Sequence, residues 1–476
     1  MADPHLPLDD VLAWARTGGS CPVVLDEQQV DRIAAAETGL RAAGRSGAVY
    51  GLTTGVGALR SVPTDRTPGR GSPALRLWRS HAGGFGETFD DTTALVAMAF
   101  RLHQITSGRS GVSQALAGAL AAALEVRAVP DLHRRGSIGT GDLIPLAELG
   151  LTLVGHRPWR VGHVAPAVVD DGDALPFMSS NAFTLATSAL ATDRLLRLSI
   201  ATERVAALSS AALRGSLQAY DPRVHAGRPD AGQARVAARL TELLDDGSLR
   251  PQVRTQDPFC LRTVPQVHAP FVDALLRTRG TVSVEVDDSS ENPMLVGDGV
   301  ALHHGGFVTA RLSAALDSLR QATYPVVALS SARLSALTDP AMTGLPAFLA
   351  TGPPDSSGVM ILEYVAQDAL AMARTMTTPV STGHAMVSLG LEEHASFSSQ
   401  AARWVESLVD NASVVVACEL VAAVRALRAD PDRLPSSPVR AVFEAAASVL
   451  DDDRLDRPLG GDVEQAVRLV EQGLPC

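Results

Sequence analysis

A short glycine-rich stretch, residues 136–145 (GSIGTGDLIP), combines the groups in this chain that are best suited to chemistry. Glycines on both sides of Thr140 remove the Cβ atoms that normally stop a chain from folding back on itself. The amide nitrogen of Gly141 could therefore approach the carbonyl carbon of Gly139, and this compression would favour a five-membered ring. The alternative is an ordinary glycine-rich turn ahead of a buried helix.

The residues behind this stretch predict the start of a helix. Asp142 is a preferred N-cap residue, and Pro145 suits the first helical turn. Because a helix N-terminus favours developing negative charge, an electrophile at this position would be strengthened.

Three further segments carry candidate side chains. Tyr50 opens a glycine loop, 50–57 (YGLTTGVG), and its phenol, with a reference pKa of about 10, needs a stabilised phenolate to act as a base near neutral pH. His81 lies in RSHAGG, although a lone histidine is more often structural than catalytic. Glu392 lies in LEEH, which would otherwise be an exposed helix face or a fragment of a metal site without a convincing third ligand.

The composition narrows the class of protein. With 476 residues, 46% apolar and 20% charged, the chain predicts a soluble globular protein with more than one core region. A net charge of -11 argues against nucleic-acid binding, and we expect no leader and no membrane helix, since no apolar run approaches about 18 residues. Four scattered cysteines make no metal spacing and favour a reducing, cytoplasmic location.

Lysine is absent, so all 41 Lys and Arg positions are arginine. Pyridoxal phosphate needs a lysine Schiff base and the Walker phosphate loop needs its lysine, so we expect neither. An enzyme acting on amino acids would then need another electron sink, which the loop at 139–141 could supply. Codon bias is the alternative explanation of the missing lysines.

Hydrophobic periodicity predicts helices through most of the chain. A glycine-, proline- and charge-rich stretch from 221 to 247 predicts a boundary near residue 220, between an N-terminal domain (1–220) and a helical bundle with C-terminal helices (221–476). The predicted helices cover 11–16, 30–43, 92–103, 111–126, 143–153, 183–217, 307–337, with a kink at Pro325, and 400–427.

The central stretch resembles the internal-cofactor loop of the histidine and aromatic amino acid ammonia-lyases. In that family an Ala-Ser-Gly inside the frame GSVGASGDLAPL closes autocatalytically into a methylidene-imidazolone electrophile. Gly139, Thr140 and Gly141 occupy the Ala-Ser-Gly positions. Dehydration of threonine would give an ethylidene, with one extra methyl group on the carbon that is attacked, and the resulting electrophile would be more hindered.

The resemblance implies roles for the other motifs. Tyr50 matches the tyrosine of YGVNTGFG that removes the β-proton of the substrate. His81 matches a histidine that contacts the substrate side chain. Segment 256–266 (QDPFCLRTVPQ) resembles QDPYSLRCxPQ, whose arginine holds the substrate carboxylate, so Arg262 takes that role, with Gln256 and Gln266 as substrate-binding candidates.

Two more positions follow from the same resemblance. Glu392 matches the glutamate of histidine-type members and is assigned to catalysis. Ser179 replaces an asparagine that hydrogen-bonds the cofactor ring, and Asn181 lies close enough in sequence to compensate.

The resemblance extends from Tyr50 to about Leu427. It implies an all-α fold with a long helical bundle and a homotetramer whose active sites are completed by several subunits. It also implies an amino acid substrate and an imidazolone-type group from 139–141 without pyridoxal phosphate or metal. Departures from the family cluster around the supposed electrophile: Thr140, Thr53, Ser179, Phe259 and Gly306.

These departures leave alternatives open. The first is a carbon–nitrogen lyase or aminomutase acting on histidine or a related amino acid through the modified ring. The second is a repurposed homologue without the ring that catalyses another elimination, cyclisation or isomerisation. The third is a binding scaffold without catalytic activity.

Overall fold

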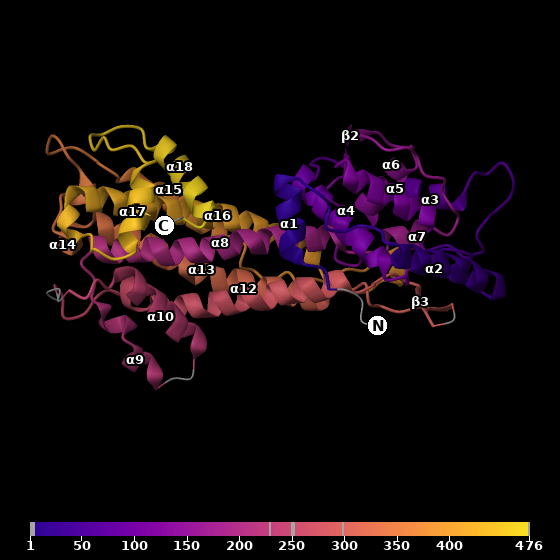
Figure 1. Cartoon of the computed structure of the whole chain (residues 1–476), viewed down its shortest axis with the longest axis horizontal. Helices are drawn as coiled ribbons and strands as arrows, with labels where there is room; N and C mark the ends of the chain where they lie inside the picture. Colours follow the sequence, from indigo (N-terminus) through magenta and orange to yellow (C-terminus); the bar gives the residue numbers. More distant parts are fainter. Residues whose placement is uncertain (1–4, 228–229, 249–252, 298, 475–476) are drawn as a thin grey trace. The chain divides into compact units, whose positions relative to one another are not determined.

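The protein is mostly helical, as predicted, with two small two-stranded sheets (Figure 1). The computed structural model describes residues 5–227, 230–248, 253–297 and 299–474. These residues form two compact units. Unit 1 takes in the described residues up to Leu190 together with 279–316 and 379–403. Unit 2 takes in 191–278, 317–378 and the described residues from Trp404 onward.

Unit 1 contains both sheets together with several short helices. Each sheet is an antiparallel pair, β1 with β2 and β3 with β4. The elements are α1 (Leu8–Thr17), α2 (Glu27–Ser46), η1 (Gly57–Leu59), α3 (Pro73–His81), α4 (Asp91–Thr106), α5 (Gln114–Glu125), β1 (Val129–Pro130), α6 (Leu143–Leu153), β2 (Trp159–Val161), α7 (Ala174–Met178), β3 (Met294–Val296), β4 (Val300–Leu302) and η4 (Ser388–Gly390).

Local sequence signals explain where the helices of unit 1 begin. Asp26 and Gln29 form a capping box at the start of α2, and the Asp90 carboxylate accepts a hydrogen bond from the Thr93 backbone N–H at 2.8 Å at the start of α4. Every residue of α4 from Thr93 to Thr106 is buried, so this helix forms the centre of the unit 1 core.

The helix that follows the glycine-rich loop is fixed by an aromatic contact. Trp78 of α3 is fully buried, donates a hydrogen bond to the Ala174 carbonyl oxygen at 3.1 Å and meets Phe177 edge-on. A Cβ on Gly150 of α6 would lie 2.8 Å from the Trp78 ring, so α6 packs directly against that ring. The position of α6 in turn fixes one end of the loop.

Four long helices pass from one unit into the other along the chain: α8 (Ala182–Ala212), α12 (Val264–Asp287), α13 (Ala310–Thr338) and α16 (Ser398–Ala429). The remaining elements of unit 2 are η2 (Leu217–Tyr220), α9 (Pro222–Ala226), α10 (Ala231–Leu244), α11 (Phe259–Arg262), α14 (Pro340–Thr343), η3 (Ala347–Leu349), α15 (Ile361–Thr375), η5 (Pro431–Arg433), α17 (Val439–Ala447) and α18 (Gly460–Glu471).

A fully buried ion pair joins three of the long helices inside unit 2. Glu419 of α16 accepts hydrogen bonds from Arg333 Nε at 2.6 Å and from Ser330 Oγ at 2.5 Å, both on α13. It also accepts from Ser209 of α8 at 2.6 Å. The side chains of Arg333 and Glu419 are completely inaccessible to solvent. The pair therefore fixes the positions of these helices relative to one another in a fully buried part of unit 2.

The observed elements follow the predicted ones closely, and helix α13 continues through Pro325, where a kink is predicted. The two compact units differ from the predicted division at residue 220, because the boundary falls inside α8 at residue 190 and the chain returns to unit 1 twice. Hydrophobic periodicity predicts where a helix lies. It does not show at which residue a long helix leaves one compact unit and enters the other.

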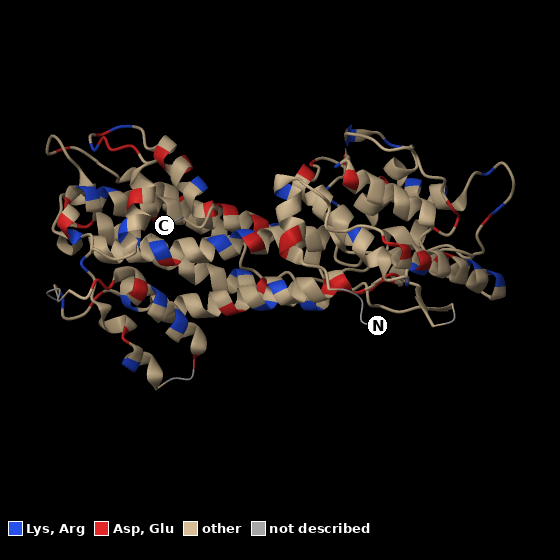
Figure 2. Cartoon of the chain, in the orientation of Figure 1, with Lys and Arg blue, Asp and Glu red and all other residues tan. Residues whose placement is uncertain are grey.

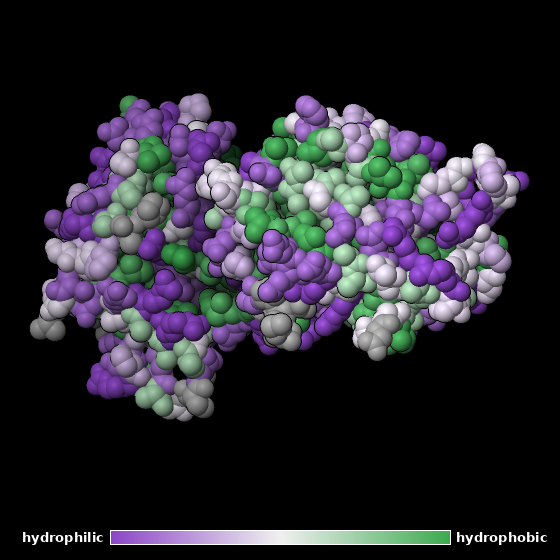
Figure 3. Space-filling view, turned by 45° about the vertical axis from the view of Figure 1, so that its right-hand side comes forward, coloured by the Kyte–Doolittle hydropathy of each residue, from purple (hydrophilic) through white to green (hydrophobic). Residues whose placement is uncertain are grey.

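Helix α16 is long and apolar enough to cross a membrane by length and composition alone, with a mean hydropathy of 1.7 over its most apolar window. However, 78% of that window is buried within the protein, as in a core helix. Arginines are interspersed with Asp and Glu along the helices (Figure 2), and hydrophobic patches reach the surface between hydrophilic residues (Figure 3).

Candidate active site

The glycine-rich loop adopts a backbone that requires its glycines. Gly139 has φ +81° and Gly141 has φ +108°, both in a region that side chains disfavour. A Cβ on Gly139 would also lie 2.1 Å from Ser396 Oγ and 2.7 Å from the Ser398 backbone nitrogen. Space as well as conformation therefore excludes alanine, the residue that the family motif carries at this position.

Hydrogen bonds reach both backbone groups that ring closure would join. Ser396 Oγ donates to the Gly139 carbonyl oxygen at 2.7 Å. The Gly141 N–H donates to Asn181 Oδ1 at 3.1 Å, and Asn181 Nδ2 donates to the Phe307 carbonyl oxygen at 2.8 Å. The carbonyl that would be attacked thus has a donor, and the amide that would attack has an acceptor.

A cluster of buried hydroxyl groups stands behind Ser396. Ser398 Oγ lies 3.2 Å from Ser396 Oγ and 2.7 Å from Thr309 Oγ1. The Phe397 backbone N–H donates to the Ile138 carbonyl oxygen at 2.8 Å, which pins segment 396–398 along the loop. These groups are neutral, so they can hold the loop without the desolvation cost of a buried charge.

Asp142 occupies the predicted N-cap position of α6, but its side chain does not cap the helix. The carboxylate instead accepts hydrogen bonds from the Thr184 backbone N–H at 2.7 Å and from Thr184 Oγ1 at 2.8 Å. Burial raises the pKa of this carboxyl, and these hydrogen bonds oppose the rise. Asp142 therefore ties the loop to the start of α8.

Tyr50 is half-buried beside η1. Its phenol oxygen accepts a hydrogen bond from the Gly57 N–H at 2.6 Å, while its own backbone N–H donates to His303 Nε2 at 3.2 Å. Burial raises the pKa of the Tyr50 phenol, the Gly57 hydrogen bond lowers it, and the charge of Glu392 raises it further. The phenol is therefore protonated near neutral pH in this environment.

Glu392 lies in a short antiparallel bridge with Val387 and not on a helix, which differs from the sequence-based alternative of an exposed helix face. It is exposed to solvent. Ser388, in the same turn, accepts a hydrogen bond from the Ala58 backbone N–H at 2.8 Å, so this turn is held against η1. Glu392 and Tyr50 are thus brought near each other from opposite ends of the sequence.

The other predicted residues of unit 1 have defined partners. His81 ends α3, and its Nδ1 lies 2.9 Å from the Leu77 carbonyl oxygen. Ser179 Oγ accepts from the Asn292 backbone N–H at 3.2 Å, so among the described residues the side-chain contact to the loop amide comes from Asn181. Thr53 Oγ1 accepts from the Val49 backbone N–H at 2.7 Å within its own turn.

Arg262 and its two predicted companions lie in unit 2. With the Gln256 amide turned so that its oxygen faces the arginine, this oxygen accepts from Arg262 Nη1 at 2.6 Å, and the guanidinium lies 4.3 Å from the centre of the Phe259 ring. Among the described residues no carboxylate pairs with Arg262. Gln266 Oε1 is buried without a hydrogen-bond partner. The arginine is therefore oriented by neutral groups and keeps its charge available for an anion.

Sequence reasoning missed Ser396, Ser398, Thr309 and His303. Ser396 and Ser398 lie in a serine-rich run, 396–400 (SFSSQ), directly after Glu392 and its neighbours, and His303 is followed by His304 and a double glycine. Neither signal points to the loop or to Tyr50, because nothing local links segments that are more than 200 residues apart.

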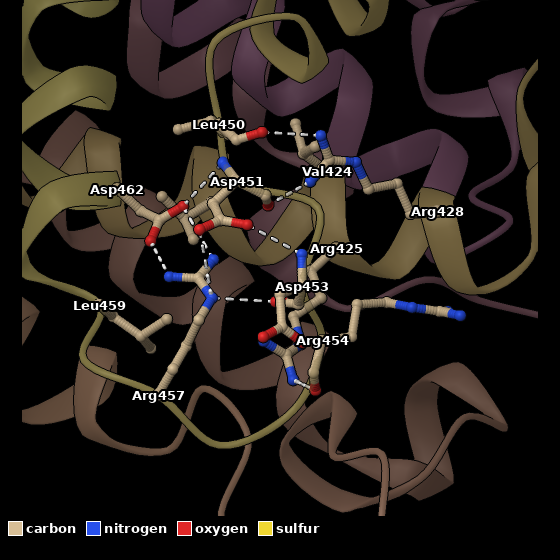
Figure 4. A pocket seen from close by; sticks show the side chains of 11 residues that line it. Val424, Arg425, Arg428, Leu450, Asp451, Asp453, Arg454, Arg457, Leu459 and Asp462 are labelled. Carbon is tan, nitrogen blue, oxygen red and sulfur yellow. Dashed lines mark hydrogen bonds and ion pairs between the residues drawn. The ribbon is translucent and has the colours of Figure 1, made fainter.

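Neither of two hollows in the described residues touches the loop. The first is a cavity of about 10 Å³ between the end of α16 and segment 450–462, and it has room for about one water molecule (Figure 4). Two of its arginines are already engaged: Arg457 pairs with Asp462 at 2.6 Å and Arg428 donates to the Asp451 carbonyl oxygen at 2.6 Å. These contacts hold segment 450–462 in place beside the end of α16.

The second hollow is a groove of about 990 Å³ in unit 1. It lies between α2, the loop after α4 and the β3–β4 hairpin, with Arg32, Gly39, Arg109 and Gly297 among its lining residues. It contains none of the side chains that the sequence singled out.

Comparisons with known proteins agree with the helical architecture and with the resemblance to the ammonia-lyases. The family model for aromatic amino acid lyases matches residues 6–448. A histidine ammonia-lyase from Geobacillus kaustophilus is 31% identical over 436 residues, which cover 87% of this chain and 86% of that protein.

Two solved structures share the fold. An ergothioneine-degrading enzyme, ergothionase from Treponema denticola, aligns with a TM-score of 0.91 and 22% identity and covers 99% of this chain and 98% of that one. The Pantoea agglomerans phenylalanine aminomutase aligns with a TM-score of 0.91 and 22% identity, covering 99% of each chain.

Proposed function

The chain belongs to the aromatic amino acid lyase family and is an enzyme of the ammonia-lyase type. From this premise we propose that it eliminates ammonia from histidine or a related amino acid through an electrophile made from Gly139, Thr140 and Gly141. The observation that carries the proposal is the pair of hydrogen bonds at the loop: Ser396 donates to the Gly139 carbonyl, and Asn181 accepts from the Gly141 amide.

The loop residues fit an internal imidazolone-type group. The glycines give the backbone its freedom to close, and both reacting groups carry a hydrogen-bond partner. When present, such a group supplies an electron sink for the substrate's amino group, which is otherwise a poor leaving group. The chain has no lysine for a pyridoxal phosphate Schiff base, so we assign this role to the loop without pyridoxal phosphate or metal.

The other candidate residues bind the substrate and move its proton. Arg262, oriented by Gln256 and the Phe259 ring, binds the carboxylate, because a planar guanidinium matches a carboxylate with two parallel hydrogen bonds. Tyr50 Oη takes the β-proton once the phenol has lost its own proton, and the Gly57 N–H that donates to this oxygen stabilises the phenolate before the transfer.

Four residues contact the remainder of the substrate in this proposal. His81 and Glu392 select an imidazole or hydroxyaryl side chain, since both offer hydrogen bonds to a ring N–H or hydroxyl. Ser179 and Gln266 complete the polar surroundings. The buried, unpaired oxygen of Gln266 supports this role, because such an atom favours a donor from a ligand or a neighbouring subunit.

We also propose that the active enzyme is a homotetramer in the cytoplasm. Large apolar side chains are exposed along single faces of α15 and α12: Ile361, Tyr364 and Met372 on the first, and Leu276 and Val284 on the second. Such stripes favour burial against other copies. The described cysteines, Cys21, Cys260 and Cys418, are free thiols, which supports a reducing compartment, while Cys476 lies outside the described residues.

Intact-protein mass spectrometry tests the electrophile directly. Ring closure and threonine dehydration together remove two water molecules, so the purified protein should be lighter than its sequence by that mass. Incubation with histidine, tyrosine and phenylalanine should release ammonia and a conjugated acrylate, followed by ultraviolet absorbance. A protein that has the full mass of its sequence and does not react with any of the three amino acids would contradict the lyase proposal.

A second candidate function is favoured by Thr140 and by the raised pKa of Tyr50. A repurposed homologue without the ring would catalyse another elimination, cyclisation or isomerisation, with Tyr50, Arg262 and Glu392 as its acid–base and carboxylate-binding groups. It predicts full protein mass together with carboxylate binding that is lost in Arg262→Ala. Isothermal titration with imidazole propionate measures that binding.

A further inference from the structure

We propose that Ser396 and Asn181 promote closure of the ring in this chain, Ser396 by polarising the Gly139 carbonyl and Asn181 by holding the Gly141 amide proton. The inference rests on the proposed function, because it concerns how the electrophile is made. It assigns a task to two residues whose types alone do not suggest one.

The position of Ser396 supports the first half of the inference. Its side chain is 3% exposed, and its hydroxyl donates to the Gly139 carbonyl oxygen at 2.7 Å. A hydroxyl has one proton, and the Gly139 carbonyl oxygen is a nearer acceptor for the Ser396 proton than Ser398 Oγ at 3.2 Å, which itself meets Thr309 Oγ1 at 2.7 Å. Ser396 Oγ accepts from the Ser398 backbone N–H at 3.3 Å, which orients the hydroxyl with its proton on the carbonyl that would gain negative charge.

The position of Asn181 supports the second half. Its side chain is 2% exposed, and its Nδ2 donates to the Phe307 carbonyl oxygen at 2.8 Å. A carbonyl can only accept, so this contact fixes the orientation of the amide and turns Oδ1 toward the Gly141 N–H. The proton of the nitrogen that would attack thereby has an acceptor as the new bond forms.

Ring closure and dehydration conserve every atom and release two water molecules. The Gly141 nitrogen bonds to the Gly139 carbonyl carbon, and the Gly141 amide proton ends on the former carbonyl oxygen. That oxygen leaves as water with the proton of the Thr140 nitrogen, which leaves a double bond between the Gly139 carbon and the Thr140 nitrogen. Thr140 then loses its hydroxyl and its Cα hydrogen as a second water. No oxidant or reductant is needed.

Neutral groups are suited to this task because the transition state carries charge only briefly. A permanently charged donor would be costly to bury beside an apolar core. A single well-placed donor to a developing oxyanion is worth about 10²–10³-fold in rate. We therefore expect Ser396→Ala to slow closure by about that factor.

The experiment follows the mass of the full-length chain over time. Protein made in a short pulse of synthesis is quenched in acid at intervals, and the loss of each water is read from the intact mass. Ser396→Ala should close about 100-fold more slowly than the wild-type chain. The matched control is Ser313→Ala, which removes an equally buried serine hydroxyl of unit 1 that has no hydrogen-bond partner among the described residues.

Three companion variants separate chemistry from packing. Ser398→Ala keeps the Ser396 donor and should slow closure less than Ser396→Ala. Asn181→Ala should also slow closure, whereas Asn181→Asp keeps an acceptor oxygen for Gly141 and should recover part of the rate. Circular dichroism and the unfolding midpoint confirm that each variant is folded.

The outcomes are distinguishable. A wild-type chain that loses two waters while Ser396→Ala or Asn181→Ala loses them at the same pace overturns this inference and leaves the proposed function standing. Equal slowing in Ser396→Ala and Ser398→Ala also overturns it, since packing would then be the cause. A wild-type chain that never loses mass overturns both the inference and the ring-dependent function.

Discussion

Two buried polar networks, one in each unit, are built from different kinds of group. In unit 1, Ser396, Ser398 and Asn181 are neutral, and Ser396 and Asn181 reach backbone atoms of the loop while Ser398 contacts Ser396. In unit 2, Arg333 and Glu419 are charged, completely buried and bonded mainly to each other and to serine hydroxyls. The first network touches the peptide atoms that the proposed ring closure would join, and the second touches side chains that hold helices together.

Under the proposed function, these two networks serve different tasks, one in chemistry and the other in stability. A buried ion pair is strongly coupled, so loss of one partner leaves an uncompensated charge. A neutral hydroxyl that contacts a backbone carbonyl costs little to bury and can change its hydrogen bond as the carbonyl changes. Substitutions in the two networks should therefore be read by different measurements.

The largest expected effect is on the loop. Thr140→Ala removes the hydroxyl that dehydration needs, so we expect ammonia release to fall by roughly 10⁴-fold or more, as for loss of a covalent catalytic group. The unfolding midpoint should stay close to that of the wild type. Steady-state ammonia assays and thermal unfolding measure the two quantities.

Thr140→Ser is the matched variant for that change. It keeps the hydroxyl and removes the methyl group from the carbon that is attacked, so it should lose two waters and react faster than the wild-type chain. Full activity in Thr140→Ala would show that the loop carries no chemistry and would remove the contrast between the two networks.

The next effect is on unit 2. Glu419→Gln keeps the shape of the side chain but leaves the Arg333 charge unpaired, and we expect unfolding to become easier by about 3–5 kcal/mol. Urea denaturation of the assembled protein measures this change. The double variant Arg333→Met with Glu419→Leu removes both charges and should recover much of the stability. Equal losses in the single and double variants would contradict the view that charge pairing dominates there.

The smallest effect concerns an imperfect pair in unit 2. Glu203 is 4% exposed, and its Oε2 lies 3.0 Å from Arg239 Nε without hydrogen-bond geometry. Burial raises the pKa of Glu203 from 4.5 to about 7, although Arg239 lowers it. Its contribution to stability is therefore fully present below about pH 4.5 and is lost as the pH rises through about 7.

Glu203→Gln should remove that pH dependence. The wild-type chain should lose up to about 3 kcal/mol of stability between pH 4.5 and 8 from this group, and the variant should not. Unfolding midpoints across this range, compared between the two proteins, give the difference. Parallel pH profiles would show that Arg239 pairs with Glu203 more fully than its geometry indicates.

Much of the fold was predictable from local patterns. The helix predicted over 143–153 has those bounds in the structure, and the long apolar runs at 183–217, 307–337 and 400–427 became α8, α13 and α16 within a few residues. Hydrophobic periodicity and turn residues act over one or two helical turns. The helices that they predict therefore form whichever tertiary partners pack against them. The prediction for the Asp142 side chain was wrong: its carboxylate does not cap α6, because it accepts hydrogen bonds from the buried Thr184 instead.

The sequence by itself determined the helices, the family and the loop whose glycines allow the chain to fold back. The tertiary structure decided which side chains meet that loop: Asn181 contacts the Gly141 amide, and Ser396 reaches Gly139 across 257 positions of sequence. The physical reason is the distance along the sequence over which each interaction acts. Backbone freedom and helical periodicity belong to neighbouring residues, whereas a hydrogen bond between distant segments exists only once packing has brought their atoms within about 3 Å.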